Sequence, residues 1–385
     1  MMVRDLAGAK TAEGRVLSAT LAFEDQEFPP QRLFFAIADE EDALPSADPF
    51  LAASFPLAAV HGERRVFIEH APCPMLVEGL RTVHAWWADW GGMPGPAPLI
   101  ETPPRKRPQD TGKRARAFGF VSGGVDGLHM LMHNRQTYGK DDPASIRQIL
   151  FIHGFDIGKK AGAPQQEHFR MAQKRLEPLA AESGVHILPC RSNLRQLPTK
   201  RDFWTHRYNV GALAAVGHAA AVGPSFLFVA GAYPLSQAVP MGTHPAVDGL
   251  YSSERVRVLH EGARFSRLDK IRDLATWPSA LAALRVCPVE CGEAANCRRC
   301  EKCLVTRLEL LAAGVEETLA LGPSLCSVEE WEAALPVPIG HRALRYGELL
   351  APLRARGHLD LCAMLEGKIA LYRQRVESGL RWPGL

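Results

Sequence analysis

From Ala117 to Gly231 the sequence alternates short apolar runs with helical patterns, and this alternation constrains the fold more than any other feature. AFGFVSGG, QILFIHGFD, VHILPCRSN and SFLFVAG have the pattern of buried strands that end in glycine or polar residues. Strands that alternate with helices in this way form parallel sheets covered by helices. We therefore expect an α/β fold with a doubly wound parallel sheet, which binds ligands at the carboxyl ends of its strands.

The remaining sequence divides around this core. With 385 residues, two or three domains are expected. Period-2 patterning predicts an N-terminal β-rich (α+β) domain over residues 1–100, followed by a basic, Pro-rich linker over 101–116. We expect the α/β domain over 117–285, a metal-binding element over 286–310 and a helical C-terminal region over 311–385.

One long uncharged stretch, Tyr208 to Val247, contains no Asp, Glu, Lys or Arg. A membrane span needs about 20 continuous apolar residues, but Gly223 and Pro224 interrupt this stretch. We expect a buried helix over about 208–222 and a buried strand over 225–231 instead. The N-terminus also lacks the apolar segment of a signal peptide, so we expect a cytoplasmic protein without a membrane partner.

The turn SGGVDG, which follows the first apolar run, has the composition of a phosphate-binding loop. Its residues are Ser122, Gly123, Gly124, Val125, Asp126 and Gly127. Paired glycines let backbone N–H groups approach a phosphate, and the N-terminus of a following helix favours negative charge. The Ser122 hydroxyl can donate a hydrogen bond, and Asp126 can hold Mg²⁺ or fix the loop.

Five of the nine cysteines lie close together late in the chain. Cys287, Cys297, Cys300 and Cys303 provide four thiols for one tetrahedral ion, and Zn²⁺ prefers such ligands. A site closed by four thiolates leaves no position for substrate, so we interpret the metal as structural. Cys291 is an alternative to Cys287 as the fourth ligand, and an iron–sulfur cluster is an alternative to zinc.

SGGVDG resembles SGGxDS, the pyrophosphate-binding loop of the PP-loop ATP pyrophosphatases, which have a HUP-like α/β fold. The chain departs from that pattern at Gly127, where the family has serine. Members of this superfamily split ATP between its α- and β-phosphates and adenylate a carboxylate or carbonyl oxygen. The resemblance implies ATP and Mg²⁺ as ligands, with His153 and Asp156 near the nucleotide at the end of the second strand.

The loop and the late C-x9-C-x2-C-x2-C pattern together resemble the 7-cyano-7-deazaguanine synthases of queuosine biosynthesis. The resemblance covers about residues 117–310 and implies an ATP-dependent ligase that forms carbon–nitrogen bonds. Its substrate would be a 7-carboxy-7-deazaguanine-like acid, converted to an amide or nitrile. In relatives from anti-phage defence the acceptor is a protein amine, so ammonia and a protein amine both remain open. By analogy the family also implies a homodimer.

Two further groups of residues are candidates for the same chemistry. Lys270 resembles a lysine that the synthase family keeps before its late helix, where it would neutralise departing pyrophosphate, and Arg267 lies one helical turn earlier. Substrate contacts are expected from the third strand end and from the long polar loop that begins at Gly242. These residues are Arg191, Asn193, Arg195, His244, Asp248, Ser253 and Glu254.

Two other functions remain open. A tRNA-modifying PP-loop enzyme would need a reactive cysteine near the loop, and Cys190 is the candidate; the net charge of +3 is too small to imply nucleic acid by itself. A nucleotide-binding, zinc-stapled module without turnover is the other alternative, motivated by Gly127 and the large additional domains.

Overall fold

The computed structural model of the protein describes residues 1–91, 93, 95–104, 112–158, 163–199, 201–287, 294–322 and 327–379. The chain forms two compact units. The first contains Met1–Ser122 and Met130–Ala263, and the second contains Gly123–His129 and Arg264–Leu385. The chain passes between them three times: after Ser122, after His129 within helix α3 (Val125–Thr137), and after Ala263. Each unit is described by itself below.

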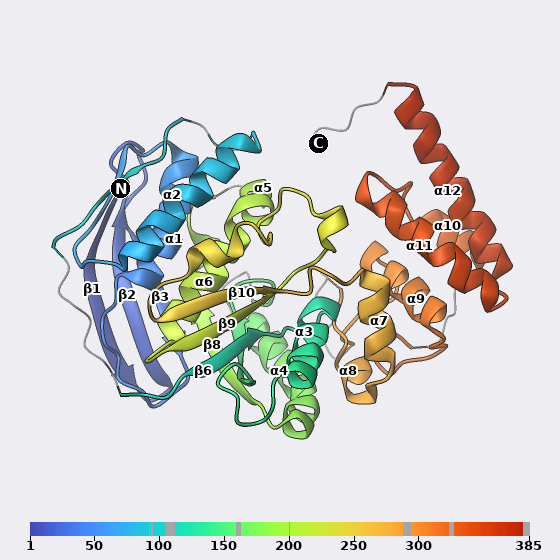
Figure 1. The fold of residues 1–385 in the computed structure, drawn as a ribbon, viewed down its shortest axis with the longest axis horizontal. Helices are drawn as coiled ribbons and strands as arrows, with labels where there is room; N and C mark the ends of the chain where they lie inside the picture. The colour runs from blue at the N-terminus through green and yellow to red at the C-terminus, as the bar shows by residue number, and fades with distance from the viewer. Residues whose placement is uncertain are drawn as a thin grey trace. The chain divides into compact units, whose positions relative to one another are not determined.

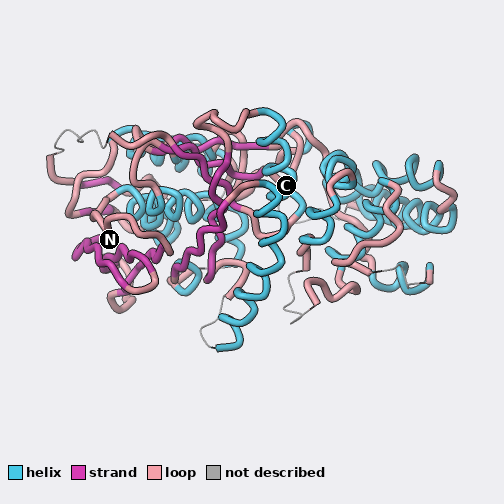
Figure 2. Tube along the Cα trace, turned by 90° about the horizontal axis from the view of Figure 1, so that it is seen from below, coloured by secondary structure: helices cyan, strands magenta, loops and turns pink. Residues whose placement is uncertain are grey.

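The first unit is built on one ten-stranded sheet with the order β10-β9-β6-β7-β8-β3-β2-β1-β4-β5. Most neighbouring strands are parallel, and Figure 2 colours the strands magenta. The strands are β1 (Met2–Thr11), β2 (Gly14–Ala22), β3 (Gln31–Ile37), β4 (Arg65–Ile68), β5 (Leu99–Glu101), β6 (Arg116–Phe120), β7 (Ile146–His153), β8 (His186–Ser192), β9 (Ser225–Ala230) and β10 (Val256–Glu261).

The half of the sheet from β8 to β10 confirms the α/β prediction. β6, β7 and β8 follow one another in space, whereas the chain then returns to place β9 on the other side of β6. The connecting helices are α3, α4 (Ala163–Ser183), α5 (Arg201–Phe203) with the π-helical turn η2 (Trp204–Tyr208), and α6 (Asn209–Ala220). The switch in direction lies between β6 and β9, which is where ligands bind in sheets of this kind.

The N-terminal residues extend this same sheet. β1, β2 and β3 are antiparallel neighbours, and β3 pairs with β8 through Phe35, Ala36 and Ile37. Two helices, α1 (Asp48–His61) and α2 (Pro74–Asp89), follow these strands (Figure 1). α1 packs against α2 and α6, and their apolar residues join the strands in one core. The boundary expected at residue 100 therefore lies inside one compact unit.

The uncharged stretch from Tyr208 to Val247 folds as the sequence predicts. It forms the buried helix α6, a short turn and the buried strand β9. No helix in the described part of the chain is long and apolar enough to span a membrane.

The prediction of one long polar loop over residues 242–270 is partly wrong, because this segment contains β10. Val256 and Val258 are buried while Arg257 is exposed, and the strand pairs in parallel with β9. The sequence hides this strand because Arg257, His260 and Glu261 interrupt its apolar residues.

The second unit is helical, as expected for the C-terminal region. Most of its helices share a core that includes Leu268, Leu308, Trp331, Leu349 and Leu365. They are α7 (Arg267–Ala275), α8 (Pro278–Ala283), α9 (Glu301–Ala313), α10 (Val328–Ala334), α11 (His341–Ala355) and α12 (Leu359–Glu377) (Figure 1).

Candidate functional site

The predicted phosphate loop lies between β6 and α3, in the expected strand–turn–helix setting. Gly123 has φ +86°, and a Cβ there would lie 2.8 Å from the carbonyl oxygen of Ala283. The Gly123 carbonyl accepts a hydrogen bond from the Arg285 N–H at 2.8 Å. Glycine is therefore required at this position to dock the turn against residues 283–285. Ser122 is exposed, and the first N–H groups of an α-helix have no partner within it.

Three predicted site residues meet at the first turn of α3. Lys270 Nζ donates to Asp126 Oδ1 at 2.9 Å, and Arg267 Nη1 donates to Asp126 Oδ2 at 3.4 Å. Both cations extend from α7, where their i, i+3 spacing places them on one helix face. The structure thus brings these three predicted residues together.

The start of α7 is fixed by a capping box. The Ser266 hydroxyl accepts from the Asp269 N–H, and the Asp269 carboxylate accepts from the Ser266 N–H. A box of this kind satisfies N–H groups that the helix leaves unpaired. It places Arg267 and Lys270 in the first turn of the helix.

The electrostatics of Asp126 favour an anchoring role over direct metal binding. Burial alone would raise the pKa of Asp126, but the charges of Lys270 and Arg267 and the Lys270 hydrogen bond hold that pKa below its usual value. Each Asp126 oxygen already accepts a hydrogen bond from a cation. Of the two roles expected for Asp126, fixing the loop therefore fits these contacts better than holding Mg²⁺.

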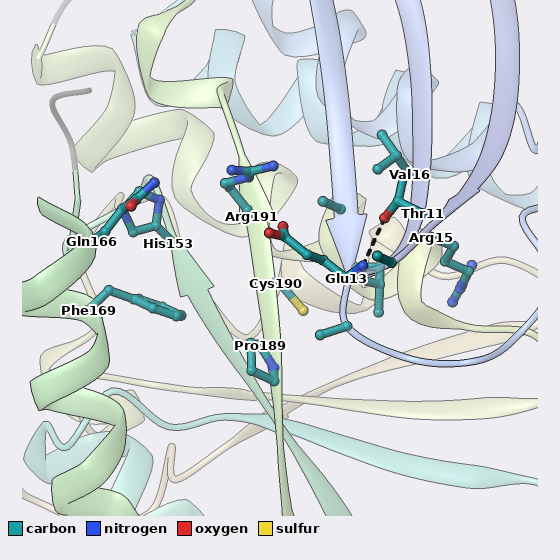
Figure 3. A pocket seen from close by; sticks show the side chains of 14 residues that line it. Thr11, Glu13, Arg15, Val16, His153, Gln166, Phe169, Pro189, Cys190 and Arg191 are labelled. Carbon is teal, nitrogen blue, oxygen red and sulfur yellow. Dashed lines mark hydrogen bonds between the residues drawn. The ribbon is translucent and has the colours of Figure 1, made fainter. Parts of the chain in front are cut away.

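A second group of predicted residues lines a cavity in the first unit. His153 and Arg191 are register partners at the ends of β7 and β8, and both border a cavity of about 480 Å³. In Figure 3, Glu13 extends from the β1–β2 turn toward Arg191, and Phe169 extends from α4 into the same space. The cavity combines an apolar floor with a few polar groups, as small-molecule sites do.

The cavity is lined by a cation, Arg191, an anion, Glu13, and the imidazole of His153. Burial lowers the pKa of His153, and the nearby positive charge of Arg191 lowers it further, so the imidazole is neutral at pH 7. Arg191 stacks its guanidinium over the Phe34 ring at 5.7 Å. Glu13 was missed by the sequence analysis, since nothing local distinguishes a glutamate in a hairpin turn.

Three other predicted residues near these strand ends are not among the residues that line the cavity. Asp156 is exposed in the turn after β7. Arg195 stacks over the Trp204 ring at 4.1 Å. Asn193 bridges strands, because its amide donates to the Arg32 carbonyl at 2.6 Å and accepts from the Phe34 N–H at 3.1 Å.

The loop candidates have structural partners in the first unit. Asp248 is completely buried and accepts from the His244 N–H at 2.8 Å, while its other oxygen bonds His260 Nδ1 at 2.7 Å. Burial raises the pKa of Asp248 even though His260 opposes this. Ser253 accepts from the N–H groups that follow it, and the Glu254 N–H bonds Cys73 Sγ at 3.3 Å. These contacts order the loop.

The four predicted metal ligands converge in the second unit. The thiol sulfurs of Cys287, Cys297, Cys300 and Cys303 all lie within 4.8 Å of one another. Three of the sulfur–sulfur distances are 3.4, 3.7 and 3.9 Å, close to the edge of about 3.8 Å in a tetrahedron of Zn–S bonds. This group can hold a metal ion such as zinc. Cys291, the alternative fourth ligand, lies outside the described residues.

The side chain of Asn296 fixes the backbone around Cys287, the first of these thiols. Asn296, which the sequence analysis missed, accepts from the N–H groups of Val286 and Cys287 and donates to the Leu284 carbonyl. Burial opposes ionisation of Cys297, but N–H groups from the following residues lower its pKa to about 7. A low pKa favours the thiolate that metals bind.

Comparison of the chain with protein-family models, with curated proteins and with solved structures found no match. Fold and site together define a class: an α/β protein with a mostly parallel sheet and a four-cysteine group that can bind a metal.

Proposed function

We propose that this protein is an ATP-dependent ligase that adenylates a carboxylate, as its resemblance to the 7-cyano-7-deazaguanine synthases suggests. The observation that carries the proposal is the meeting of Lys270 and Arg267 with Asp126 at the first turn of α3. Two cations beside a helix N-terminus that follows a glycine turn suit the phosphates of ATP.

In the proposed reaction, a substrate carboxylate oxygen attacks the α-phosphorus of ATP. The α–β phosphoanhydride bond breaks, and an acyl-adenylate and pyrophosphate form. Lys270 and Arg267 stabilise the charge on the departing pyrophosphate, with Mg²⁺ as the ATP counter-ion. An amine then attacks the acyl carbon, AMP leaves and the amine loses a proton to solvent, which yields an amide.

The cavity of the first unit suits the acid substrate. The Arg191 guanidinium can bind a carboxylate through two N–H groups. The Glu13 carboxylate can accept from the adjacent ring N–H and amino group that a deazaguanine presents, and Phe169 can contact the ring face. The acceptor of the acyl group, ammonia or a protein amine, is left to experiment.

We propose that the four-cysteine group binds zinc and that its role is structural. Zinc would cross-link residue 287 to the start of α9, and no catalytic step passes through it.

Pyrophosphate release tests the proposal. The protein is incubated with ATP, Mg²⁺ and 7-carboxy-7-deazaguanine, and we expect release that depends on the acid. Lys270→Ala should reduce the rate at least 100-fold, whereas Lys174→Ala, which removes an exposed lysine of α4, should not change it. ATP binding without release for any acid would favour the inactive module instead.

The tRNA-thiolating alternative depends on Cys190. That thiol is buried, donates to the Leu188 carbonyl, and has its pKa raised strongly by burial. A thiol of this kind is a poor nucleophile. We therefore expect Cys190→Ala to retain activity; its loss would favour the alternative.

A further inference from the structure

The cluster around Asp126 extends to two residues that the sequence did not single out. Glu309 of α9 accepts from Arg267 Nε at 3.2 Å and from Arg345 Nε at 2.6 Å. Arg345 comes from α11, outside residues 117–310, so the C-terminal helices contribute directly to this cluster.

Glu309 is a buried carboxylate held between two guanidinium groups. Its side chain is completely inaccessible to solvent. A buried carboxylate is costly unless it is paired and hydrogen-bonded. The two arginines satisfy it, and in return it fixes both of their side chains.

The two arginines differ in the donors they have left. Arg267 also bonds Asp126 and, at 3.4 Å, the Thr306 hydroxyl. Arg345 uses only Nε, and among the described residues no hydrogen-bond partner contacts its Nη1 or Nη2. Because the Arg345 side chain is 27% exposed, these N–H groups can reach a ligand.

The charge balance of the cluster also favours an anion. Lys270, Arg267 and Arg345 carry three positive charges, and Asp126 and Glu309 carry two negative charges. The net charge is +1. The field of Arg345 also reaches Asp126, since it helps to lower the pKa of that carboxyl group.

We propose that Arg345 is a third phosphate-binding residue of this site, and that Glu309 is the residue that positions it. This inference rests on the proposed function, because it assigns Arg345 to the β- and γ-phosphates of the same ATP. Guanidinium groups bind phosphate oxygens through paired N–H groups, and Nη1 and Nη2 supply such a pair. AMP lacks these two phosphates, so Arg345 should not contribute to AMP binding.

The test is calorimetric titration of the full chain with Mg²⁺ and three probes: ATP, inorganic pyrophosphate and AMP. Arg345→Ala should weaken ATP and pyrophosphate binding about tenfold to a hundredfold and leave AMP binding unchanged. Arg345→Lys should restore part of the loss because it keeps the charge. Glu309→Gln should weaken pyrophosphate binding less than Arg345→Ala, because glutamine still accepts a hydrogen bond.

Arg342→Ala is the matched control. Arg342 lies one turn earlier on α11 and pairs with Glu301 at 2.8 Å, away from Glu309. It should bind all three probes as the unmodified chain does, and circular dichroism should show that each variant is folded.

Three results would overturn the inference. Arg345→Ala with unchanged pyrophosphate affinity, or with an equal loss for AMP, would mean that Arg345 only neutralises Glu309. Arg345→Lys without any recovery, in a folded protein, would also contradict phosphate binding. If the unmodified chain binds neither ATP nor pyrophosphate, the proposed function itself fails; if it binds both and only the variant comparison fails, the proposed function stands.

Discussion

The two groups of predicted site residues differ in what their charges are bonded to. Around Asp126, three cations surround two carboxylates, and Arg345 keeps donors unused. Around Asp248, one buried carboxylate is fully used by a backbone N–H and by His260. A polar side chain whose bonds are all made inside the protein organises structure, whereas one with unused donors can bind a ligand. The predictions below test this difference.

The largest effect should come from the four-cysteine group. One of its members, Cys303, lies in the first turn of α9, the helix that also carries Glu309. We expect Cys303→Ser to lose the zinc that we propose for this group and to destabilise the second unit by several kcal/mol, since metal binding to such sites is coupled to folding. Elemental analysis and thermal denaturation measure both effects.

Cys362→Ala is the control for this variant. Cys362 is a buried thiol of α12 outside the four-cysteine group, so its loss should leave the metal content unchanged. Full metal retention in Cys303→Ser would show that the group is not the binding site.

Next in size, Asp248→Ala should lower the free energy of unfolding by about 2–3 kcal/mol, because it leaves His260 Nδ1 and the His244 N–H buried without an acceptor. ATP affinity should not change. Urea unfolding and calorimetric titration measure the two quantities, with the exposed Asp141→Ala as control. If Asp248→Ala were as stable as the unmodified chain but no longer bound ATP, Asp248 would be a ligand-binding residue. The proposed difference between the two groups would then be wrong.

The sequence predicted features that depend on local pattern. The apolar runs of β6 to β9 gave strands, and the close spacing of the late cysteines gave the thiol group. Arg267 and Lys270 were placed on one face because their spacing matches the helical period. Local patterns of this kind need no knowledge of distant contacts.

Features that depend on distant pairing were missed. The pairing of β3 with β8, which merges the N-terminal strands into one sheet, joins residues far apart in the chain. α1 was not predicted, because Pro49 and Pro56 both lie within it. The partner of Asp248, His260, lies on a strand that the sequence did not reveal, so an internal bond was interpreted as a substrate contact.

A smaller effect should separate two neighbours at the end of β8. Asn193→Ala should cost about 1–2 kcal/mol, because it removes two hydrogen bonds to β3. Arg191→Ala should change the unfolding free energy by less than about 0.5 kcal/mol, because Arg191 is exposed, but it should weaken binding of the acid. Urea unfolding and titration with 7-carboxy-7-deazaguanine distinguish them, and equal effects of both variants on acid binding would contradict the assignment.

The smallest effect should be a pH dependence at Asp126. Its pKa in the folded protein is below the ordinary value of 3.8, so the ionised carboxylate stabilises the fold above about pH 4, and this contribution disappears as the pH falls through the folded-state pKa. Asp126→Asn should therefore be less stable than the unmodified chain by about 1 kcal/mol at pH 7, and the difference should shrink toward pH 3. Urea unfolding at pH 7, 5 and 3 measures it. A stability difference that grows on acidification would mean that Lys270 and Arg267 do not stabilise the Asp126 carboxylate. The comparison with Asp248 would then fail, because it assumes that these cations and Asp126 form one charged cluster.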